Sequence, residues 1–474
     1  MAVLVALGCV GPRGPAPERA DGPGGSAHFH VRVDEALSAL WAEICFAGEP
    51  PSALISLSEA AEELLVQAYD SEGEAIPMGD DRIELDRFGP GDCVHYEVDL
   101  QRVSRASRGA LRRRGDLLIT QNLWLWAPSQ RPDTASYTVE FELPRGMYVS
   151  VPWERDGEHY RLEESCFRTA GNTVFTFTEP RRFQRSGVTV ELVRLPGELE
   201  ADGPTLERWI GEAIDAVAGL YGSFPRERLQ IVTVPAGPGT RPVAFGLVRR
   251  GGGASVMLLL HENAEADALV TDWTAVHELT HLTMPLLEVS DTWLSEGVAT
   301  YYQEVLRARA GLQTGQEAWA NLLAGFDRGA EVGTRRTLAD EARHMRQTGA
   351  YRRVYWAGTA FALEADVTLR AQTGVSLDQL ISRSQGAWPR RRIWQGRAVM
   401  RRFDRLAGGG LLVPLFDRYA ESRRFPDPSA VLARLGVLRR AGRLVLNDDA
   451  PLAHIREAIM SPIAAVPESG SARP

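Results

Sequence analysis

The stretch VHELTHLTMPLLEVSDTWLSEGVATYY, from Val276 to Tyr302, decides the fold. It holds His277 and His281 four residues apart, with Glu278 between them. Residues four apart on a helix share one face, so both imidazoles reach one point, while Glu278 is rotated by about 100° and lies beside it. The pattern is typical of a metal site with a neighbouring general base, as in zinc hydrolases.

A third ligand is needed, because catalytic zinc usually takes three protein groups and leaves a fourth position to water. The first predicted helix ends at Pro285, and Thr271 or Asp272 is its predicted N-cap. A second helix is predicted over DTWLSEGVATYYQEVLRARAGL, and the short connection makes the two helices antiparallel neighbours. Glu296 then arrives opposite the histidines, whereas Glu288 lies in the connection, where we expect a solvated charge.

We therefore predict that His277, His281 and Glu296 bind one Zn²⁺ ion. The alternatives are a half-exposed histidine face without metal and a surface carboxylate at Glu296. With nine histidines in the chain, an HExxH pattern arises by chance in about one such sequence in a hundred. The metal is favoured because the motif lies on a strong helix and an acidic residue follows on the next one. HENAE at His261 lacks the second histidine.

Length and composition restrict the class of protein. The 474 residues are too many for one typical core, so two or three domains are expected. The content of 44% hydrophobic and 24% charged residues is that of a globular protein. A net charge of −9 argues against a general affinity for nucleic acid or anionic lipid. No apolar run reaches the roughly 20 residues that span a bilayer. We also expect the protein to be a monomer.

The N-terminus MAVLVALGC is a short apolar run before a Pro/Gly-rich segment. It resembles the end of a bacterial lipoprotein signal, which implies a lipid anchor at Cys9 and a cell-envelope or periplasmic location. A disordered cytosolic leader is the alternative. If Cys9 is lipidated, three cysteines remain, enough for at most one disulfide and one free thiol.

The pattern along the chain predicts an α+β multidomain protein. After a leader over 1–25, strands of alternating polarity predict a β-rich domain over 26–195. A mixed segment follows, in which GPGTRPVAFGLVRRGGG is a predicted Gly-rich loop and Ala254–Leu260 a predicted edge strand that pairs with substrate. Helical spacing dominates from Ala264 onward, and a disordered tail is predicted over 456–474. The clearest predicted strands are FHVRV, CVHYEVDL, YTVEFELP, MYVSVPW, NTVFTFTE and VTVELVRL.

HELTH followed by WLSEGVATYY resembles the gluzincin zinc metallopeptidases of the aminopeptidase N clan, and most closely the glycyl aminopeptidase family. The segment RRVYWAGTAFALEADVTLRAQTGVSLDQLI resembles that family's Tyr-x-Lys-Gly segment and the helix after it, with Tyr355 followed by Gly358. The likeness implies a thermolysin-like catalytic domain over 196–325, a small mixed sheet with the HExxH helix. It also implies a helical domain over 326–455 that completes the active-site cleft.

Carried over to this chain, the resemblance makes His277, His281 and Glu296 zinc ligands. It makes Glu278 the catalytic base, and the Tyr355 hydroxyl supports the tetrahedral intermediate. For a residue that orients a ligand histidine, the predicted candidates are Thr300 and Glu304, with plain helix surface as the alternative.

The chain departs from the family where an aminopeptidase holds its substrate's free amine. The matching stretch VAFGLVRRGGGASVML has no Asp or Glu, and Arg249 and Arg250 stand there instead. An arginine pair attracts carboxylate and repels ammonium, although both could simply be exposed loop charges. We therefore predict a zinc metallopeptidase acting on a peptide or protein, with aminopeptidase and endopeptidase activity both open. The main alternative is a zinc-bearing binding or scaffold protein with this fold, and a further one is hydrolysis of a non-peptide substrate at the same zinc.

Overall fold

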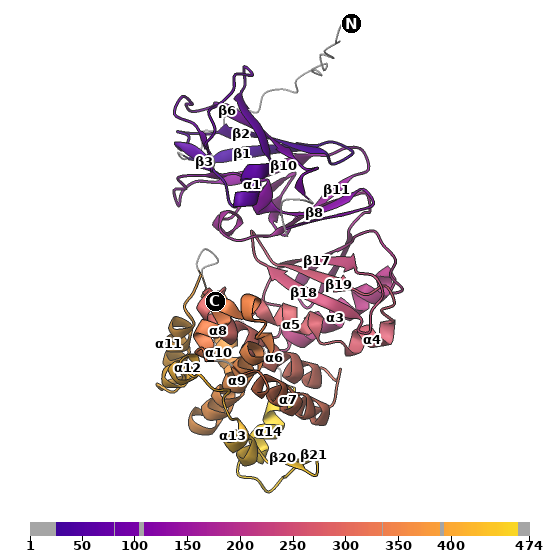
Figure 1. Ribbon diagram of the computed structural model, residues 1–474, viewed down its shortest axis with the longest axis vertical. Helices are drawn as coiled ribbons and strands as arrows, with labels where there is room; N and C mark the ends of the chain where they lie inside the picture. Colours follow the sequence, from indigo (N-terminus) through magenta and orange to yellow (C-terminus); the bar gives the residue numbers. More distant parts are fainter. Residues whose placement is uncertain (1–24, 80, 104–108, 334, 389–392, 463–474) are drawn as a thin grey trace, which may run out of the picture. The chain divides into compact units, whose positions relative to one another are not determined.

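The computed structural model describes residues 25–79, 81–103, 109–333, 335–388 and 393–462 (Figure 1). Cys9 and the other residues of the predicted leader up to residue 24 lie outside these residues. No helix in the described part of the chain combines the length and the apolar character that a membrane crossing requires. The chain divides into two compact units, the first formed by residues 1–106, 123–144 and 155–162, the second by 107–122, 145–154 and 163–474.

The first unit contains a seven-stranded sheet with the strand order β12-β13-β10-β1-β2-β6-β4. Side chains alternate along each strand, so that Phe29 and Val31 are fully buried whereas His28 and His30 lie on the half-exposed face. The strands are β1 (Ala27–Val33), β2 (Ala39–Phe46), β4 (Leu65–Asp70), β6 (Cys93–Asp99), β10 (Tyr137–Glu142), β12 (Glu154–Asp156) and β13 (His159–Arg161). The unit also has helix α1 (Glu59–Leu64) and a smaller sheet of β5 (Arg82–Glu84), β3 (Ala53–Ile55) and β9 (Ala127–Pro128).

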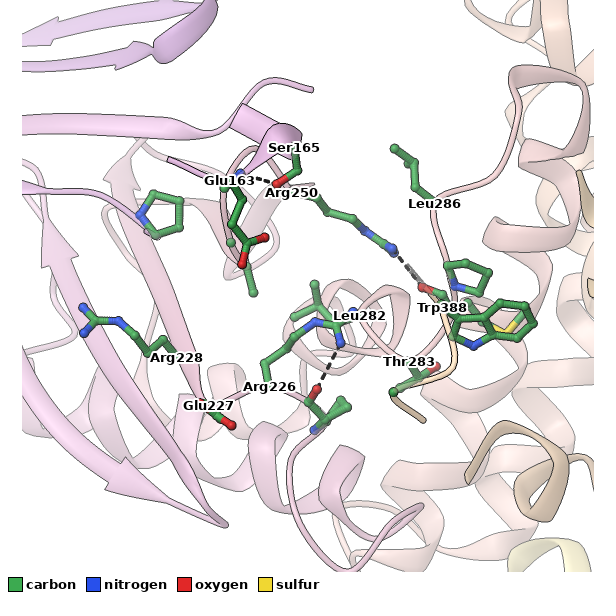
Figure 2. A pocket seen from close by; sticks show the side chains of 18 of the residues that line it. Glu163, Ser165, Arg226, Glu227, Arg228, Arg250, Leu282, Thr283, Leu286 and Trp388 are labelled. Atoms are coloured by element: carbon green, nitrogen blue, oxygen red, sulfur yellow. Dashed lines mark hydrogen bonds between the residues drawn. The ribbon is translucent and has the colours of Figure 1, made fainter. Parts of the chain in front are cut away.

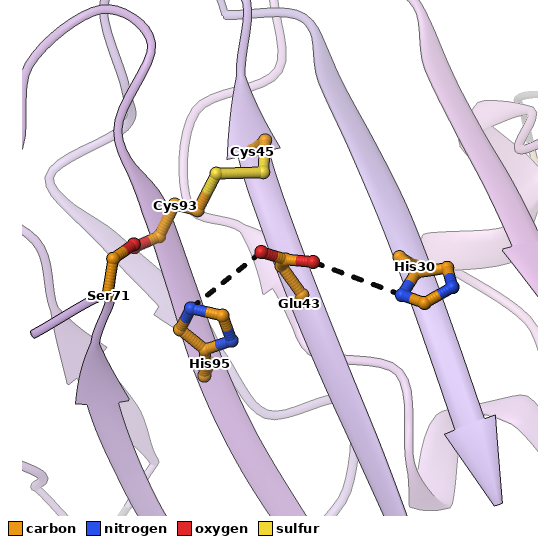
Figure 3. Close-up of a disulfide and its surroundings, with 6 residues drawn as sticks. All are labelled: His30, Glu43, Cys45, Ser71, Cys93 and His95. Atoms are coloured by element: carbon orange, nitrogen blue, oxygen red, sulfur yellow. Dashed lines mark hydrogen bonds and ion pairs between the residues drawn. A yellow bond between two sulfur atoms is a disulfide. The ribbon is translucent and has the colours of Figure 1, made fainter. Parts of the chain in front are cut away.

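A disulfide joins Cys45 of β2 to Cys93 of β6, where the two residues are directly opposed across the strands (Figure 3). Cys166 is buried and free. One disulfide and one free thiol is the most that these three cysteines allow.

Two sheets belong to the second unit. One has the order β11-β14-β8-β7 and the other is the mixed sheet β15-β16-β17-β19-β18. Their strands are β7 (Ala110–Arg113), β8 (Asp116–Thr120), β11 (Tyr148–Ser150), β14 (Asn172–Thr176), β15 (Arg181–Arg185), β16 (Val188–Arg194), β17 (Arg228–Pro235), β18 (Val243–Arg249) and β19 (Ser255–Leu260). Each of the six segments predicted most clearly as strands contains a strand. The predicted domain boundary at residue 195, however, separates β16 from its parallel partner β17. An alternating pattern identifies a strand and does not reveal which sheet it joins.

The edge of the mixed sheet differs from the prediction. β19 lies between β17 and β18, so the segment Ala254–Leu260 is interior and not the edge. The predicted Gly-rich loop instead contains β18, the edge strand, which pairs antiparallel with β19. Gly246 in β18 is required by close packing, because a Cβ there would lie 2.6 Å from the Glu278 side chain.

The helix predicted to carry the histidines is divided in two, α4 (Ala266–Thr271) and α5 (Thr274–His281). Between them the Asp272 carboxylate accepts a hydrogen bond from the Thr274 N–H at 2.7 Å, so this residue supports the start of α5. The second predicted helix is α6 (Thr292–Arg309), which follows a short 3₁₀ turn over Val289–Asp291.

The remainder is mainly helical, as predicted. The helices are α3 (Gly203–Ala218), α7 (Gly315–Ala330), α8 (Leu338–Thr348), α9 (Tyr351–Thr373), α10 (Leu377–Arg383), α11 (Gly396–Ala407), α12 (Leu412–Ala420), α13 (Ser429–Leu435) and α14 (Ala453–Met460), with a hairpin of β20 (Val437–Arg440) and β21 (Arg443–Leu446). Helix α14 overlaps the start of the predicted disordered tail, because buried Ile455 and Ile459 pack it into the core.

Candidate active site

Helix α5 is held at its C-terminal end by an arginine. Arg250 donates hydrogen bonds to the backbone carbonyls of His281 and Met284, the latter at 2.8 Å. A cation at this position satisfies carbonyls that the helix leaves free and complements the helix dipole. Arg250 therefore has a structural role at the helix end, which differs from both alternatives considered for the arginine pair, a carboxylate-binding pair or exposed loop charges.

Helices α5 and α6 bring the three predicted metal ligands together. The Nε2 atoms of His277 and His281 lie 3.3 and 3.5 Å from the same oxygen of Glu296, Oε2. One ligand atom from each of the three residues lies within 4.8 Å of the others. We call His277, His281 and Glu296 the helix cluster. Two helices joined by a short connection thus produce the convergence that the sequence predicted.

Each histidine of the helix cluster is oriented through its other ring nitrogen. His277 Nδ1 lies 2.8 Å from Gln303 Oε1, and His281 Nδ1 lies 3.1 Å from Ser295 Oγ. Such partners leave Nε2 free to face a metal. Neither Thr300 nor Glu304 contacts a ligand histidine directly. In the part of the chain that the structure describes, the Thr300 hydroxyl has no hydrogen-bond partner. Glu304 accepts a hydrogen bond from the Gln303 amide at 2.9 Å and so acts on His277 only through Gln303.

Electrostatic attraction holds the helix cluster. Burial alone would raise the pKa of Glu296, but the two histidines outweigh it and hold that pKa well below the usual range. Burial likewise opposes protonation of His277, yet Glu296 and Glu278 raise its pKa. A carboxylate that stays ionised at this depth is a ready ligand for a cation.

Glu278 is almost fully buried beside the helix cluster, 8% exposed. Burial is the largest cause that raises the pKa of Glu278, and the charges of His277 and His281 partly offset it. A hydrogen bond from the backbone N–H of Val248 in the edge strand also lowers the pKa of Glu278. A buried carboxyl group with a raised pKa, next to a metal-type cluster, is suited to proton transfer.

Tyr355 reaches the same place from helix α9. Its ring is nearly parallel to that of His277, with centroids 6.1 Å apart. Burial, followed by the charges of Glu296 and Glu278, raises the pKa of Tyr355, so its hydroxyl is a proton donor at neutral pH. Gly297 of α6 and Gly358 of α9 allow this approach, because a Cβ on either would collide with the backbone of the other helix.

A cavity of about 500 Å³ lies elsewhere in the second unit (Figure 2). Arg226, Arg228, Arg250, Glu163 and Trp388 are among its lining residues, and no member of the helix cluster lines it. The cavity lies next to the C-terminal end of α5, where Arg250 binds. Neither of the predicted catalytic residues, Glu278 and Tyr355, lines it.

Glu288 and His261, neither of which the sequence favours as a ligand, both lie outside the helix cluster. Glu288 contributes its backbone N–H to the carbonyl of Trp394. His261 Nδ1 lies 2.6 Å from the carbonyl of Arg241. Neither residue belongs to the group that offers converging ligand atoms.

The architecture is similar to that of known peptidases. An aminopeptidase N family protein from Idiomarina loihiensis superposes with a TM-score of 0.67 at 14% identity, covering 87% of this chain and 78% of that one. The M1 zinc metallopeptidase from Deinococcus radiodurans gives 0.53 at 17% identity, covering 85% and 94%. The chain has the gluzincin aminopeptidase-like fold.

Yeast LTA4 hydrolase shares this fold, with a TM-score of 0.53 at 10% identity and coverage of 88% and 71%. No protein-family model and no curated protein sequence matches the chain. The predicted fold class is therefore confirmed as mixed α+β, with a β-rich N-terminal part and a helical C-terminal part.

Proposed function

We propose that the protein is a zinc-dependent metallopeptidase that hydrolyses peptide bonds at the helix cluster. The observation that carries the proposal is the convergence of His277, His281 and Glu296 with Glu278 beside them. Several of the structures with the same fold are M1 zinc metallopeptidases from Deinococcus radiodurans, and one of these is bound to a Tyr-Ser-Ala substrate.

The helix cluster fits zinc in donor type and spacing. Two imidazole nitrogens and one carboxylate oxygen are the ligands of many catalytic zinc sites, which leave a fourth position open. Bonds of about 2.0–2.1 Å in tetrahedral geometry separate ligand atoms by roughly 3.3–3.4 Å. The separations of 3.3 and 3.5 Å from Glu296 Oε2 are close to that value.

The residues around the helix cluster divide the chemistry between them. Zinc, when bound, lowers the pKa of water and polarises a carbonyl. Glu278 accepts the proton of the attacking water and delivers it to the leaving amine nitrogen. The Tyr355 hydroxyl donates a hydrogen bond to the oxyanion that develops on the substrate, an interaction that typically contributes several kcal/mol. Strand β18, the sheet edge beside Glu278, pairs with an extended substrate backbone.

The segment from Val243 to Leu260 contains no Asp or Glu that could bind a substrate amine. Arg249, at the end of β18, is half-buried, and its Nε has no hydrogen-bond partner in the described part of the chain. With Arg250 assigned to the helix end, Arg249 is the residue left to attract a substrate carboxylate. We therefore expect peptides with a blocked N-terminus to be cleaved as well as free ones.

A panel of peptides with free and blocked N-termini, incubated with the zinc-loaded full-length chain with and without a chelator, tests the proposal. Hydrolysis that the chelator abolishes and zinc restores supports it. Cleavage of free peptides alone identifies an aminopeptidase, and cleavage of blocked ones an endopeptidase. No hydrolysis of any peptide by zinc-loaded protein overturns it and favours a zinc-bearing binding protein.

We also propose that the protein is exported. The Cys45–Cys93 disulfide supports this, because disulfides persist in oxidising compartments such as the periplasm. Fractionation of cells that produce the full chain should find it in the envelope or periplasm, whereas recovery in the cytosol with both thiols reduced contradicts export.

A further inference from the structure

Four histidines lie on the half-exposed face of the seven-stranded sheet in the first unit: His28, His30, His95 and His159. Glutamates alternate with them across the strands. Figure 3 shows part of this arrangement, in which Glu43 of β2 lies between His30 of β1 and His95 of β6. A face with this composition, far in sequence from the helix cluster, has no part in the proposed peptidase chemistry.

One group on this face has converging ligand atoms: His28 of β1, Glu140 of β10 and His159 of β13, which we call the sheet cluster. Glu140 Oε2 lies 3.8 Å from His28 Nε2 and 3.5 Å from His159 Nδ1. The three ligand atoms lie within 4.8 Å of one another. Zinc ligands are separated by roughly 3.3–3.4 Å. The two separations from Glu140 Oε2 are somewhat longer, and rotation about the side-chain torsions would bring the three ligand atoms to the spacing that zinc needs.

The sheet cluster is not satisfied by its own hydrogen bonds. The two imidazole–carboxylate distances exceed the usual 2.7–3.2 Å of an N–H···O bond. His159 Nδ1 is buried yet has no hydrogen-bond partner in the described part of the chain. A cation placed between the three ligand atoms would supply the missing partner.

His28 is already oriented as a ligand. Its Nδ1 lies 2.9 Å from Thr138 Oγ1, which leaves Nε2 directed at Glu140. The arrangement repeats the one at His277, where Gln303 holds Nδ1.

We propose that His28, Glu140 and His159 bind a second divalent cation of the zinc type, with water completing the coordination. The site has a structural consequence. Strand β13 pairs with β10 through only two residue pairs, Thr138 with Arg161 and Val139 with Tyr160. An ion held by three strands would fix β13 to β10 and β1. Another group of potential ligands on the face, Glu43 with Cys45 and Cys93, is excluded because its cysteines form the disulfide.

The experiment uses the full chain with His277→Ala and His281→Ala, in which the helix cluster cannot hold an ion. Equilibrium dialysis against Zn²⁺, with Co²⁺ absorption as a second probe of tetrahedral coordination, should give one ion per chain. Adding His159→Gln should remove that ion, while His95→Gln, a matched change on the same face, should retain it. The half-exposed positions of these side chains make both substitutions compatible with folding, which circular dichroism verifies.

Thermal unfolding gives a second measurement. Zn²⁺ should raise the melting temperature of the double variant, and His159→Gln should abolish that rise. The proposal is overturned if the double variant binds no ion, or if His159→Gln and His95→Gln weaken binding equally, which indicates diffuse binding to the face. Because the helix cluster is disabled throughout, these outcomes do not depend on the proposed peptidase function.

Discussion

The helix cluster and the sheet cluster have the same donors, two imidazoles and one carboxylate, in very different surroundings. In the helix cluster the side chains of His277, His281 and Glu296 are 4, 11 and 15% exposed. In the sheet cluster those of His28, Glu140 and His159 are 33, 38 and 45% exposed. Burial strengthens electrostatic interactions and excludes water, so the helix cluster is suited to tighter binding.

The two clusters also differ in what stands beside the ligands. Glu278 and Tyr355 lie next to the helix cluster and can transfer a proton and donate a hydrogen bond. The residues that interact with the sheet cluster include Thr138 and His30, and neither is a buried carboxyl group or a tyrosine hydroxyl of the kind that Glu278 and Tyr355 provide. Ligands alone bind a metal, whereas catalysis needs a base and an oxyanion donor placed around it. The comparison therefore assigns chemistry to one cluster and stabilisation to the other.

The substitution with the largest expected effect on activity separates catalysis from metal binding. Glu278→Gln should lower kcat by about 10²–10⁴-fold, because the general base is lost. Zinc content should stay unchanged, since Glu278 is not a ligand. Peptide hydrolysis and metal analysis of the same preparation check both. The matched change His159→Gln should leave kcat unaltered; a comparable loss there would make the sheet cluster part of the reaction.

Tyr355→Phe should lower kcat by about 10²–10³-fold with little change in KM, because the hydroxyl acts on the oxyanion and not on the bound substrate. Tyr351→Phe is the control one helical turn earlier, where the ring is 42% exposed. Steady-state kinetics of both variants decide the matter, and equal rates in Tyr355→Phe and wild type would remove this residue from the mechanism.

Gln303→Leu should weaken zinc binding at the helix cluster by about 10–100-fold, because His277 loses the partner that orients it. Competition with a chromophoric chelator measures the dissociation constant. Thr300→Val is the control on the same helix, since its hydroxyl makes no hydrogen bond to any of the described residues. If the two variants bind zinc equally well, Gln303 has no orienting role.

Thr138→Val is the corresponding change at the sheet cluster and has the smallest expected effect. It should weaken zinc binding by about 10-fold or less, the lower limit for the loss of a residue that orients a ligand histidine. Water can replace the lost hydroxyl at the half-exposed His28, which it cannot do at buried His277. Zinc titration of the variant that lacks His277 and His281 measures it. A loss larger than that of Gln303→Leu would contradict the role assigned to burial.

The two clusters also show how much the sequence predicts. His277, Glu278 and His281 lie within one and a half helical turns, and Glu296 follows on the next helix, so local spacing was enough to bring them together. Tyr355 was found through resemblance and not through any pattern. The sheet cluster was missed, because its members are more than 100 residues apart for two of the three pairs and meet only through strand order.

The supporting residues were harder to predict than the ligands. Thr300, Gln303 and Glu304 are all near the face of α6 that carries Glu296, and the crossing of α5 with α6 selects Gln303. In the same way, Arg250 could not be separated from Arg249 by sequence, since only the position of the α5 end shows which carbonyls it meets. Strand β18 was taken for a loop because its glycine serves close packing against Glu278.

Crystals of the zinc-loaded chain, measured at the zinc absorption edge, test the central claim most directly. We predict an anomalous peak about 2.0–2.2 Å from His277 Nε2, His281 Nε2 and a Glu296 carboxylate oxygen. A map without that peak, or one in which Glu296 points away from the ion, would contradict the account.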